Sequence, residues 1–266
     1  MGALYEEHSP PARLLPYVEC FWRVTAARAL PDHPVLPDGC LDLVFSPDYG
    51  LRAVGAMTVT RRHALAPGQT FTGVRFRPGK APCFLRIPAQ DLTDRSVELE
   101  DLWGAAGRSL RQNLSEVHAF HDQAGLLAGH LAASAEVTPS DRALDAIAAA
   151  DGNVDLQWIA RHANLSLRQF RRRCLALTGL SPKLLCRVLR FRGALRVART
   201  GEFRTWARVA AECGYYDQAH LIRDFQEFTG APPGVAVFSK TGAGSRPYNR
   251  GVGRTTREAY ARADVG

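Results

Sequence analysis

Three arginines lie on one side of a short predicted helix in the second half of the chain. In the segment NLSLRQFRRRCLALTGLSP, residues 164–182, Arg168, Arg171 and Arg172 fall on the side away from Phe170. A guanidinium group presents its N–H donors as a planar fork, which fits the paired N7 and O6 acceptors of a guanine edge or the oxygens of a phosphate. The spacing therefore predicts a surface that binds a polyanion.

A second segment of the same pattern, YYDQAHLIRDFQEFTGAPP, occupies residues 215–233. Its outward positions hold Gln218, Ala219, Ile222 and Arg223. Glutamine can pair with adenine, and apolar side chains can contact the thymine methyl group, so the two helices are expected to prefer different bases. One short helix reads too few base pairs to specify a site, which gives a reason for the duplication.

Each of these helices is preceded by a shorter helix with an apolar face at i, i+3, i+4 and i+7 spacing. The apolar positions are Leu156, Ile159, Ala160 and Ala163 in the first copy, and Trp206, Val209, Ala210 and Cys213 in the second. Ser166 and Asp217 are placed to cap the second helix of each pair. Two helices joined by a tight turn predict a helix-turn-helix unit, whose second helix can enter the major groove.

The segment SPKLLCRVLRFRGALRVART, between the copies, predicts a long helix that fixes the distance between the two readers. Its arginines, Arg187, Arg190, Arg192 and Arg199, are predicted to lie outside, where they can contact phosphates.

The first part of the chain has a different pattern. Residues 40–45, 52–60 and 70–78 are short, rich in Val, Phe and Thr, and bounded by turn residues, which predicts a compact β sandwich or barrel. Helical spacing begins at Ser109, and Asp141 is placed to cap a further helix.

The expected organisation is α+β: a barrel-like β domain followed by an all-α domain of two helix-turn-helix units. Its parts are a β-rich domain at 1–108, connecting helices at 109–138, the double helix-turn-helix at 139–238 and a disordered basic tail at 239–266. The connecting helices could form a dimer or pack on the barrel, and the sequence leaves both open.

Charge and composition narrow the function classes. Residues 1–140 hold 13 Lys and Arg against 15 Asp and Glu, whereas residues 141–238 hold 15 against 9. Excess positive charge confined to the later part is typical of a polyanion-binding module beside a neutral companion. The chain has no apolar run long enough for a membrane span and no signal-peptide pattern, so a cytoplasmic location is expected. The six cysteines are expected to be reduced thiols.

The span 141–238 resembles the DNA-binding domain of the AraC/XylS family of bacterial transcription regulators. The resemblance rests on IARHANLSLRQFRRRCLALTGLSP, on VLRFRGALRVAR and on VAAECGYYDQAHLIRDFQEFTGAPP. It implies a one-component, sequence-specific regulator, expected to be an activator, with double-stranded DNA, RNA polymerase, a small-molecule effector and a second copy of the chain as partners. The predicted DNA contacts are Ser166, Arg168, Arg171, Arg172, Arg190, Tyr216, Gln218, Ala219, Ile222 and Arg223.

The first hundred residues resemble an uncharacterised, cupin-like amino-terminal domain found on some of these regulators. A small barrel with one open mouth commonly encloses a ligand. The predicted effector contacts are Glu19, Trp22, Cys40, Asp42 and Arg75, while Asp38 with Gly39 is predicted to form a turn. The paired H-x-H of metal cupins is missing, so neither a metal nor a cofactor is predicted.

Two other functions are weighed against the regulator. A cysteine-dependent DNA repair enzyme fused to a DNA reader would have Cys83 as its candidate nucleophile, but Lys80 and Arg86 give that thiol weak support and no four-cysteine zinc site is present. We therefore expect no catalysis. A nucleoid-type protein without sequence choice is disfavoured by the mixed character of the two reading faces.

Overall fold

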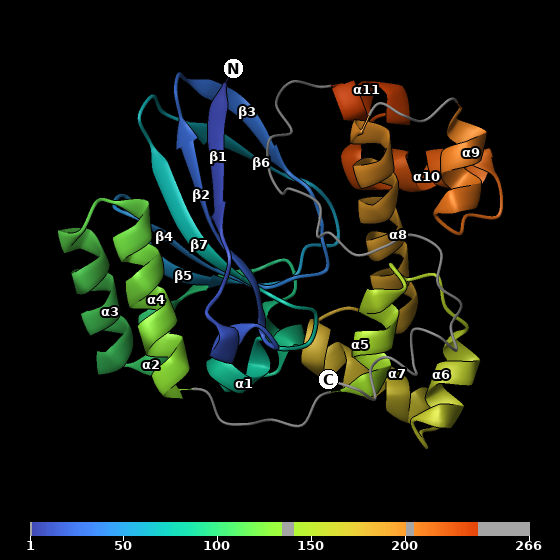
Figure 1. Cartoon of the computed structure of the whole chain (residues 1–266), viewed down its shortest axis with the longest axis horizontal. Coiled ribbons are helices and arrows are strands. Elements are labelled where there is room, and N and C mark those ends of the chain that lie inside the picture. The colour runs from blue at the N-terminus through green and yellow to red at the C-terminus, as the bar shows by residue number, and fades with distance from the viewer. Residues whose placement is uncertain (1, 135–140, 201–204, 239–266) are drawn as a thin grey trace.

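The computed structural model describes residues 2–134, 141–200 and 205–238. The β-rich part lies beside the helical part, and the two form one continuous hydrophobic core (Figure 1). The basic segment 239–266, which we expected to be disordered, lies outside the described residues. Within the described ranges, no helix is both long and apolar enough to cross a membrane.

Six strands form an antiparallel sheet in the order β1-β2-β7-β4-β5-β8. Their bounds are β1 Ala3–His8, β2 Val18–Ala26, β4 Asp42–Ser46, β5 Gly50–Val54, β7 Thr70–Phe76 and β8 Ser96–Glu98. Side chains alternate between the two faces of the sheet. Phe21, Leu43 and Val74 belong to the main core, and Cys20 and Trp22 point to the other side.

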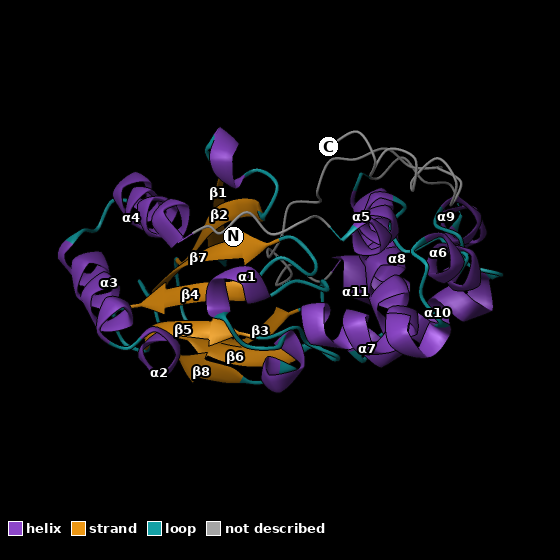
Figure 2. Ribbon diagram, turned by 90° about the horizontal axis from the view of Figure 1, so that it is seen from below, coloured by secondary structure: helices purple, strands orange, loops and turns teal. Residues whose placement is uncertain are grey.

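A second antiparallel pair, β3 (Leu30–Val35) and β6 (Arg61–Leu65), covers this other side. Leu30 and Leu65 pack with Cys20, Trp22 and Val24 in a small core of their own. The β part is thus an open six-stranded sheet, with β1 and β8 at its edges, and the β3–β6 pair packs on one of its faces (Figure 2). His33 is buried in this region, and no hydrogen-bond partner of its Nδ1 lies among the described residues.

Helices cover the main-core face of the sheet. α2 (Leu99–Trp103) and α3 (Ala105–Glu116) pack with β5, and α4 (Phe120–Ser134) packs with β2 and β7. The connecting helices therefore pack on the β part within this chain. They begin earlier than the predicted Ser109, since α2 starts at Leu99. Gly104, with a positive φ of 57°, separates α2 from α3.

The helical part runs from α5 to α11. The bounds are α5 Arg142–Ala149, α6 Leu156–His162, α7 Leu167–Thr178, α8 Pro182–Arg199, α9 Trp206–Glu212, α10 Gln218–Thr229 and α11 Pro233–Phe238. Asp141 caps α5 by accepting from the backbone N of Leu144, as its position predicted. The close-packed alanines of the two shorter helices, Ala160 and Ala210, are fully buried.

The expected α+β architecture, with an antiparallel β part followed by helices, is confirmed. The strand predicted over residues 52–60 is correct only as far as Val54, where β5 ends. Gly55 comes so close to another segment that a Cβ would lie 1.8 Å from the carbonyl oxygen of Leu92. The chain leaves the sheet there and forms the loop 55–60.

Candidate nucleic-acid interface

Helix α7 is capped at both of its ends. Ser166 accepts from the backbone N of Gln169, whose side chain in turn accepts from the backbone N of Ser166, which completes a capping box. At the other end, Gly179 takes a left-handed conformation with φ 75° and ends the helix. Phe170 and Cys174 face the core. These contacts fix the rotation of α7 about its own axis.

That rotation exposes the predicted reading arginines. Arg168, Arg171 and Arg172 are all exposed, and within the described residues none of them forms an ion pair. By contrast, Arg173 pairs with Asp141 at 2.5 Å. The three unpaired guanidinium groups leave their donors available for an external anion.

Helix α10 presents a more mixed face. Asp217 caps it by accepting from the backbone N of His220, and Gln218, Ala219 and Arg223 are exposed. Tyr216, just before the cap, is 94% exposed. An exposed aromatic ring and an exposed amide are both suited to contact bases or sugars.

Ile222 departs from the prediction for the second reading face. Its side chain is half-buried and packs against the core, so only part of it is available for a base contact. The contact face of α10 is therefore narrower than the sequence pattern indicated.

Two linker arginines predicted to lie outside are instead engaged inside the protein. Arg187 pairs with Asp224 at 2.7 Å and with Glu227 at 2.5 Å, which ties α8 to α10. Arg192 pairs with Glu19 at 2.6 Å, which ties α8 to the β part. Neither guanidinium is free to contact a phosphate in this arrangement.

Arg190 has an intermediate position. Its guanidinium carbon lies 5.7 Å from the centre of the buried Tyr215 ring, a cation–π distance. Its side chain is half-buried, and no hydrogen-bond partner for Nε is found among the described residues. The structure thus gives Arg190 a packing role beside the phosphate contact that the sequence predicted.

The two reading helices lie at opposite ends of α8 (Figure 1) and on the same side of it (Figure 2). Both end in glycines with nearly equal positive φ angles, 75° at Gly179 and 73° at Gly230. The two units thus end their second helices in the same way.

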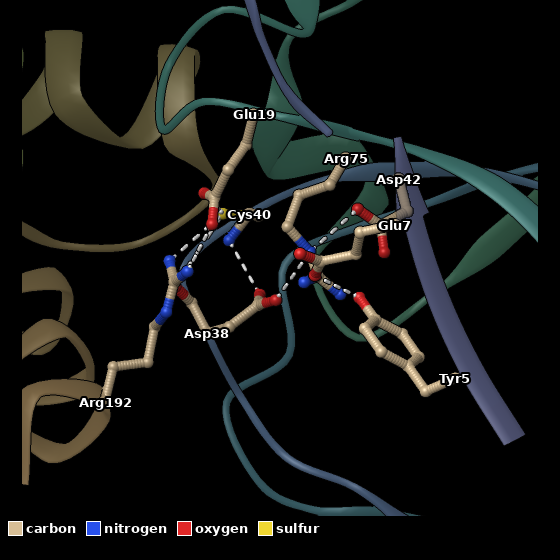
Figure 3. A network of polar contacts seen from close by, with 8 residues as sticks. All are labelled: Tyr5, Glu7, Glu19, Asp38, Cys40, Asp42, Arg75 and Arg192. Carbon is tan, nitrogen blue, oxygen red and sulfur yellow. Dashed lines mark hydrogen bonds and ion pairs between the residues drawn. The ribbon is translucent and has the colours of Figure 1, made fainter. Parts of the chain in front are cut away.

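Four of the five predicted effector residues, Glu19, Cys40, Asp42 and Arg75, lie together in a second polar site in the β part (Figure 3). Arg75 of the central strand β7 lies opposite Cys20 of β2 and Asp42 of β4 in the strand register. Arg75 Nε lies 3.0 Å from Asp38 Oδ2 and 3.5 Å from Asp42 Oδ1. Glu19 and Cys40 join the same network through Arg192.

Asp38 has two tasks in this network. Its Oδ1 accepts from the backbone N of Cys40 at 3.0 Å, and Gly39 has a φ of 78°, so the predicted turn is present. Its Oδ2 at the same time pairs with Arg75. Asp38 was predicted only to form a turn, whereas in the structure it also contacts both buried guanidinium groups.

Burial sets the protonation of this network. Burial raises the pKa of Asp42 to about 7. The Arg75 guanidinium opposes this rise only in part, because it is shared with Asp38, and the carboxylates of Asp38 and Glu19 add to the rise. For Glu19, burial opposes ionisation, but the guanidinium groups of Arg192 and Arg75 together hold the pKa below its ordinary value. At neutral pH the Asp42 carboxyl group is thus partly protonated, while that of Glu19 is ionised.

Trp22, the remaining predicted effector residue, lies outside this network. Its indole ring covers Gly73, where a Cβ would come within 2.5 Å of the ring. Within the described residues, Trp22 Nε1, Arg75 Nη1 and Asp42 Oδ1 are buried without a hydrogen-bond partner. Unsatisfied buried polar atoms are rare in folded proteins, which sets this part of the interior apart from the apolar core.

The sequence did not predict the buried ion pair of Arg192, the contact of Asp38 with Arg75, or the bonds of Thr60 and Thr93 to helix ends. Arg192 carried a usable signal, since it falls four residues after Val188 and three before Leu195, inside the apolar stripe of α8. A charged residue in such a stripe indicates a buried ion pair.

Two family models match the chain. One, described as a helix-turn-helix domain, covers residues 159–236, and the other, described as a domain of unknown function, covers residues 6–98. The first range contains both reading helices and α8, and the second contains the strands of the β part except the first three residues of β1. Among curated proteins, none matches this chain.

Crystal structures of ToxT from Vibrio cholerae are similar over most of the chain. The apo form of a ToxT variant from strain SCE256 is 13% identical and has a TM-score of 0.39, and the similarity covers 90% of this chain and 97% of that one. Wild-type ToxT from the same strain, bound to an unsaturated fatty acid, is 12% identical with a TM-score of 0.41, covering 92% and 98%. ToxT from strain O395 is 12% identical with a TM-score of 0.40, covering 91% and 98%.

Proposed function

We propose that the chain, a DNA-binding transcription regulator of the AraC/XylS type, reads double-stranded DNA with α7 and α10 and responds to a small molecule bound in its β part. In this proposal residues 1–108 sense the effector, 109–138 connect, and 139–238 read DNA. A single chain carries both readers and needs no palindromic site.

The observation that carries this proposal is the contrast between the paired and unpaired arginines. Arg187 and Arg192 are tied into carboxylates. Arg168 and Arg172 are exposed and, within the described residues, have no carboxylate partner. Charge that is neither neutralised internally nor needed for folding is what a nucleic-acid interface requires.

The effector part of the proposal is supported by the interior polar site. Arg75 and Asp42 are buried side by side at the centre of the sheet, and each keeps a polar atom without a hydrogen-bond partner among the described residues. Arg192 lies in the same network and belongs to α8, the helix between the two readers. A ligand that displaced these contacts would act directly on the reading unit.

Catalysis is not part of the proposal. Cys83, the candidate nucleophile of a repair enzyme, donates its thiol to the Lys80 carbonyl at 2.6 Å. Burial raises the pKa of Cys174, Cys186 and Cys213 to about 12, which makes them poor nucleophiles at neutral pH.

Two further partners belong to the proposal. A groove of about 840 Å³ runs between α3 and α4, and its wall includes Gly125 and Gly129, where a Cβ would meet nothing within 4 Å. This groove is where we place a second copy of the chain. RNA polymerase would contact the helical part away from the reading faces, as an activator requires.

Selection of bound sequences from random double-stranded DNA tests the proposal. The wild-type chain is expected to select two blocks of conserved bases about one helical turn apart. Replacing Arg168, Arg171 and Arg172 by alanine should erase one block and leave the other, whereas Arg108→Ala, an exposed arginine on α3, should leave both. Repeating the selection with a cellular metabolite extract looks for an effector. Selection of no preferred sequence by the wild type would refute the proposal.

A further inference from the structure

The β part touches the C-terminal end of each reading helix through a different loop. Thr93 Oγ1 donates to the Gly179 carbonyl, at the end of α7, at 2.8 Å. The backbone N of Thr60 donates to the Phe228 carbonyl, in the last turn of α10, at 3.2 Å, and its hydroxyl donates to the same oxygen. Last-turn carbonyls have no partner within their own helix, so these bonds satisfy acceptors that would otherwise need water.

The two loops are joined to each other by Asp94. Its carboxylate accepts from the backbone N of Thr58 at 2.9 Å and from the Thr58 hydroxyl at 2.7 Å. Its backbone N donates to the Ala56 carbonyl at 3.1 Å, and its carbonyl accepts from Arg61 at 3.0 Å. Asp94 holds a positive φ of 57°, a conformation that aspartate tolerates better than most residues.

Close backbone approach makes this loop pair stiff. The backbone N of Gly55 donates to the Arg95 carbonyl at 2.9 Å, and no side chain larger than hydrogen fits at Gly55 against Leu92. On the other side, a Cβ at Gly179 would lie 2.7 Å from Thr93 Oγ1 and 3.0 Å from the Ala89 carbonyl. The loop pair therefore cannot shift relative to α7 without breaking these contacts.

We propose that the loop pair 55–60 and 89–95 is a clamp that fixes the orientation and separation of α7 and α10, with Asp94 as the positioning residue at its centre. The β part, together with α8, then sets the spacing between the two DNA elements that the chain reads. This inference rests on the proposed function, since it concerns how the same two helices meet DNA.

The clamp adds what α8 alone does not supply. Arg187 ties α8 to α10 through Asp224, whereas Arg173 of α7 pairs with Asp141 of the α5 cap. Among the described residues, no ion pair joins α7 to α8, and the two helices meet through the short turn at Leu180 and through apolar packing. Thr93 gives α7 a hydrogen bond to the β part, which is also bonded to the end of α10 through Thr60.

Paired threonine variants of the full-length chain test the clamp. Thr60→Val and Thr93→Val together remove both hydroxyl bonds and keep side-chain shape. Thr25→Val and Thr70→Val together are a matched control, because those hydroxyls lie 3.5 Å apart on β2 and β7 and touch neither reader. Asp94→Ala is a second, independent variant of the joint between the loops.

The readout is the distribution of spacings between the two base blocks selected from random DNA. Wild type and control should prefer one spacing over spacings one base pair longer or shorter. In the clamp variants this preference should fall roughly three- to tenfold. If Thr60→Val with Thr93→Val keeps the wild-type distribution while binding the same blocks, the clamp is wrong and the proposed function stands. If the wild type selects no blocks, both are wrong.

Discussion

Arg192 of α8 and Glu19 of β2 form a charge pair that is largely buried on both sides, with their side chains 15% and 8% exposed. Arg192 Nη2 donates to Glu19 Oε1 at 2.6 Å, and Nη1 donates to the Asp38 carbonyl at 3.2 Å. The pair joins the β part to the helix between the readers. It also removes from the DNA face one arginine whose position in a basic helix suggested a phosphate contact.

Breaking this pair on one side should destabilise the fold. Glu19→Leu leaves the Arg192 guanidinium buried without its carboxylate and is expected to lower the free energy of unfolding by about 3 to 5 kcal/mol. Replacing both residues, by Glu19→Leu and Arg192→Met, should recover most of that loss, because no uncompensated charge remains. Urea unfolding of the wild type and the two variants measures this, and a double variant no more stable than Glu19→Leu would contradict it.

The glycines that end the two reading helices offer a matched comparison. Both adopt positive φ, so alanine at either position costs about 1 to 2 kcal/mol for backbone strain alone. At Gly179 the new Cβ would also collide with Thr93 and Ala89 of the β part, while at Gly230 it meets nothing within 4 Å. Gly179→Ala should therefore lower the free energy of unfolding by about 1 to 3 kcal/mol more than Gly230→Ala. Equal losses in urea unfolding would show that the loop at Thr93 moves freely.

Asp42 gives the fold a specific dependence on pH. Burial raises its folded pKa to about 7, above the value near 4 of the unfolded chain, so the folded state binds the proton more tightly. Its contribution to stability is fully present below about pH 4 and is lost as the pH rises through 7. Arg75, Asp38 and Glu19 face it and do not reverse this direction.

Thermal unfolding from pH 5 to 8 checks this dependence. The melting temperature of the wild type should fall relative to that of Asp42→Asn, which keeps the shape of the side chain but does not titrate. Parallel curves for the two proteins would place the Asp42 pKa below this range.

Local signals explain why the helical part was predictable from the sequence. Ser166 and Asp217 follow capping rules, and Phe170 and Phe225 follow the helical period, so each depends on neighbours within a few residues. The loop 55–60 was not predictable in this way. Its departure from the strand is dictated by Leu92, which is distant in sequence, and nothing near Thr60 or Thr93 indicates that each bonds a helix end.

The interior polar site was only partly predictable for the same reason. Cys40 and Asp42 share a strand face by simple alternation, and Arg75 joins them because β7 lies between β2 and β4. The sequence could indicate the face but not the strand order. The partner of Glu19 lies on a helix of the other half of the chain, a contact that no local pattern encodes.

A variant of Arg190 distinguishes packing within the protein from contact with a DNA phosphate. If its guanidinium reaches a phosphate beyond the Tyr215 ring, Arg190→Ala should weaken binding to all sequences alike and flatten the dependence of log affinity on log salt by about one unit. Titrations at several salt concentrations against specific and random DNA measure the slope. An unchanged slope would leave Arg190 with the cation–π contact to Tyr215 alone.

Arg172 provides the most direct test of base reading. It is exposed on α7 and, among the described residues, has no ion-pair partner, so its removal should not disturb the fold. Arg172→Ala is expected to weaken binding to the selected site by about 1 to 3 kcal/mol and to relax the base preference at one position of the first block. Arg173→Ala is a neighbouring control, since that side chain is engaged with Asp141.

Binding isotherms for Arg172→Ala on the selected site and on random DNA separate the two roles of an arginine at this position. A loss confined to the selected site assigns Arg172 to a base edge, because only base contacts carry sequence information. An equal loss on both DNAs would assign it to a phosphate and move the reading of the first block to Arg168 or Arg171.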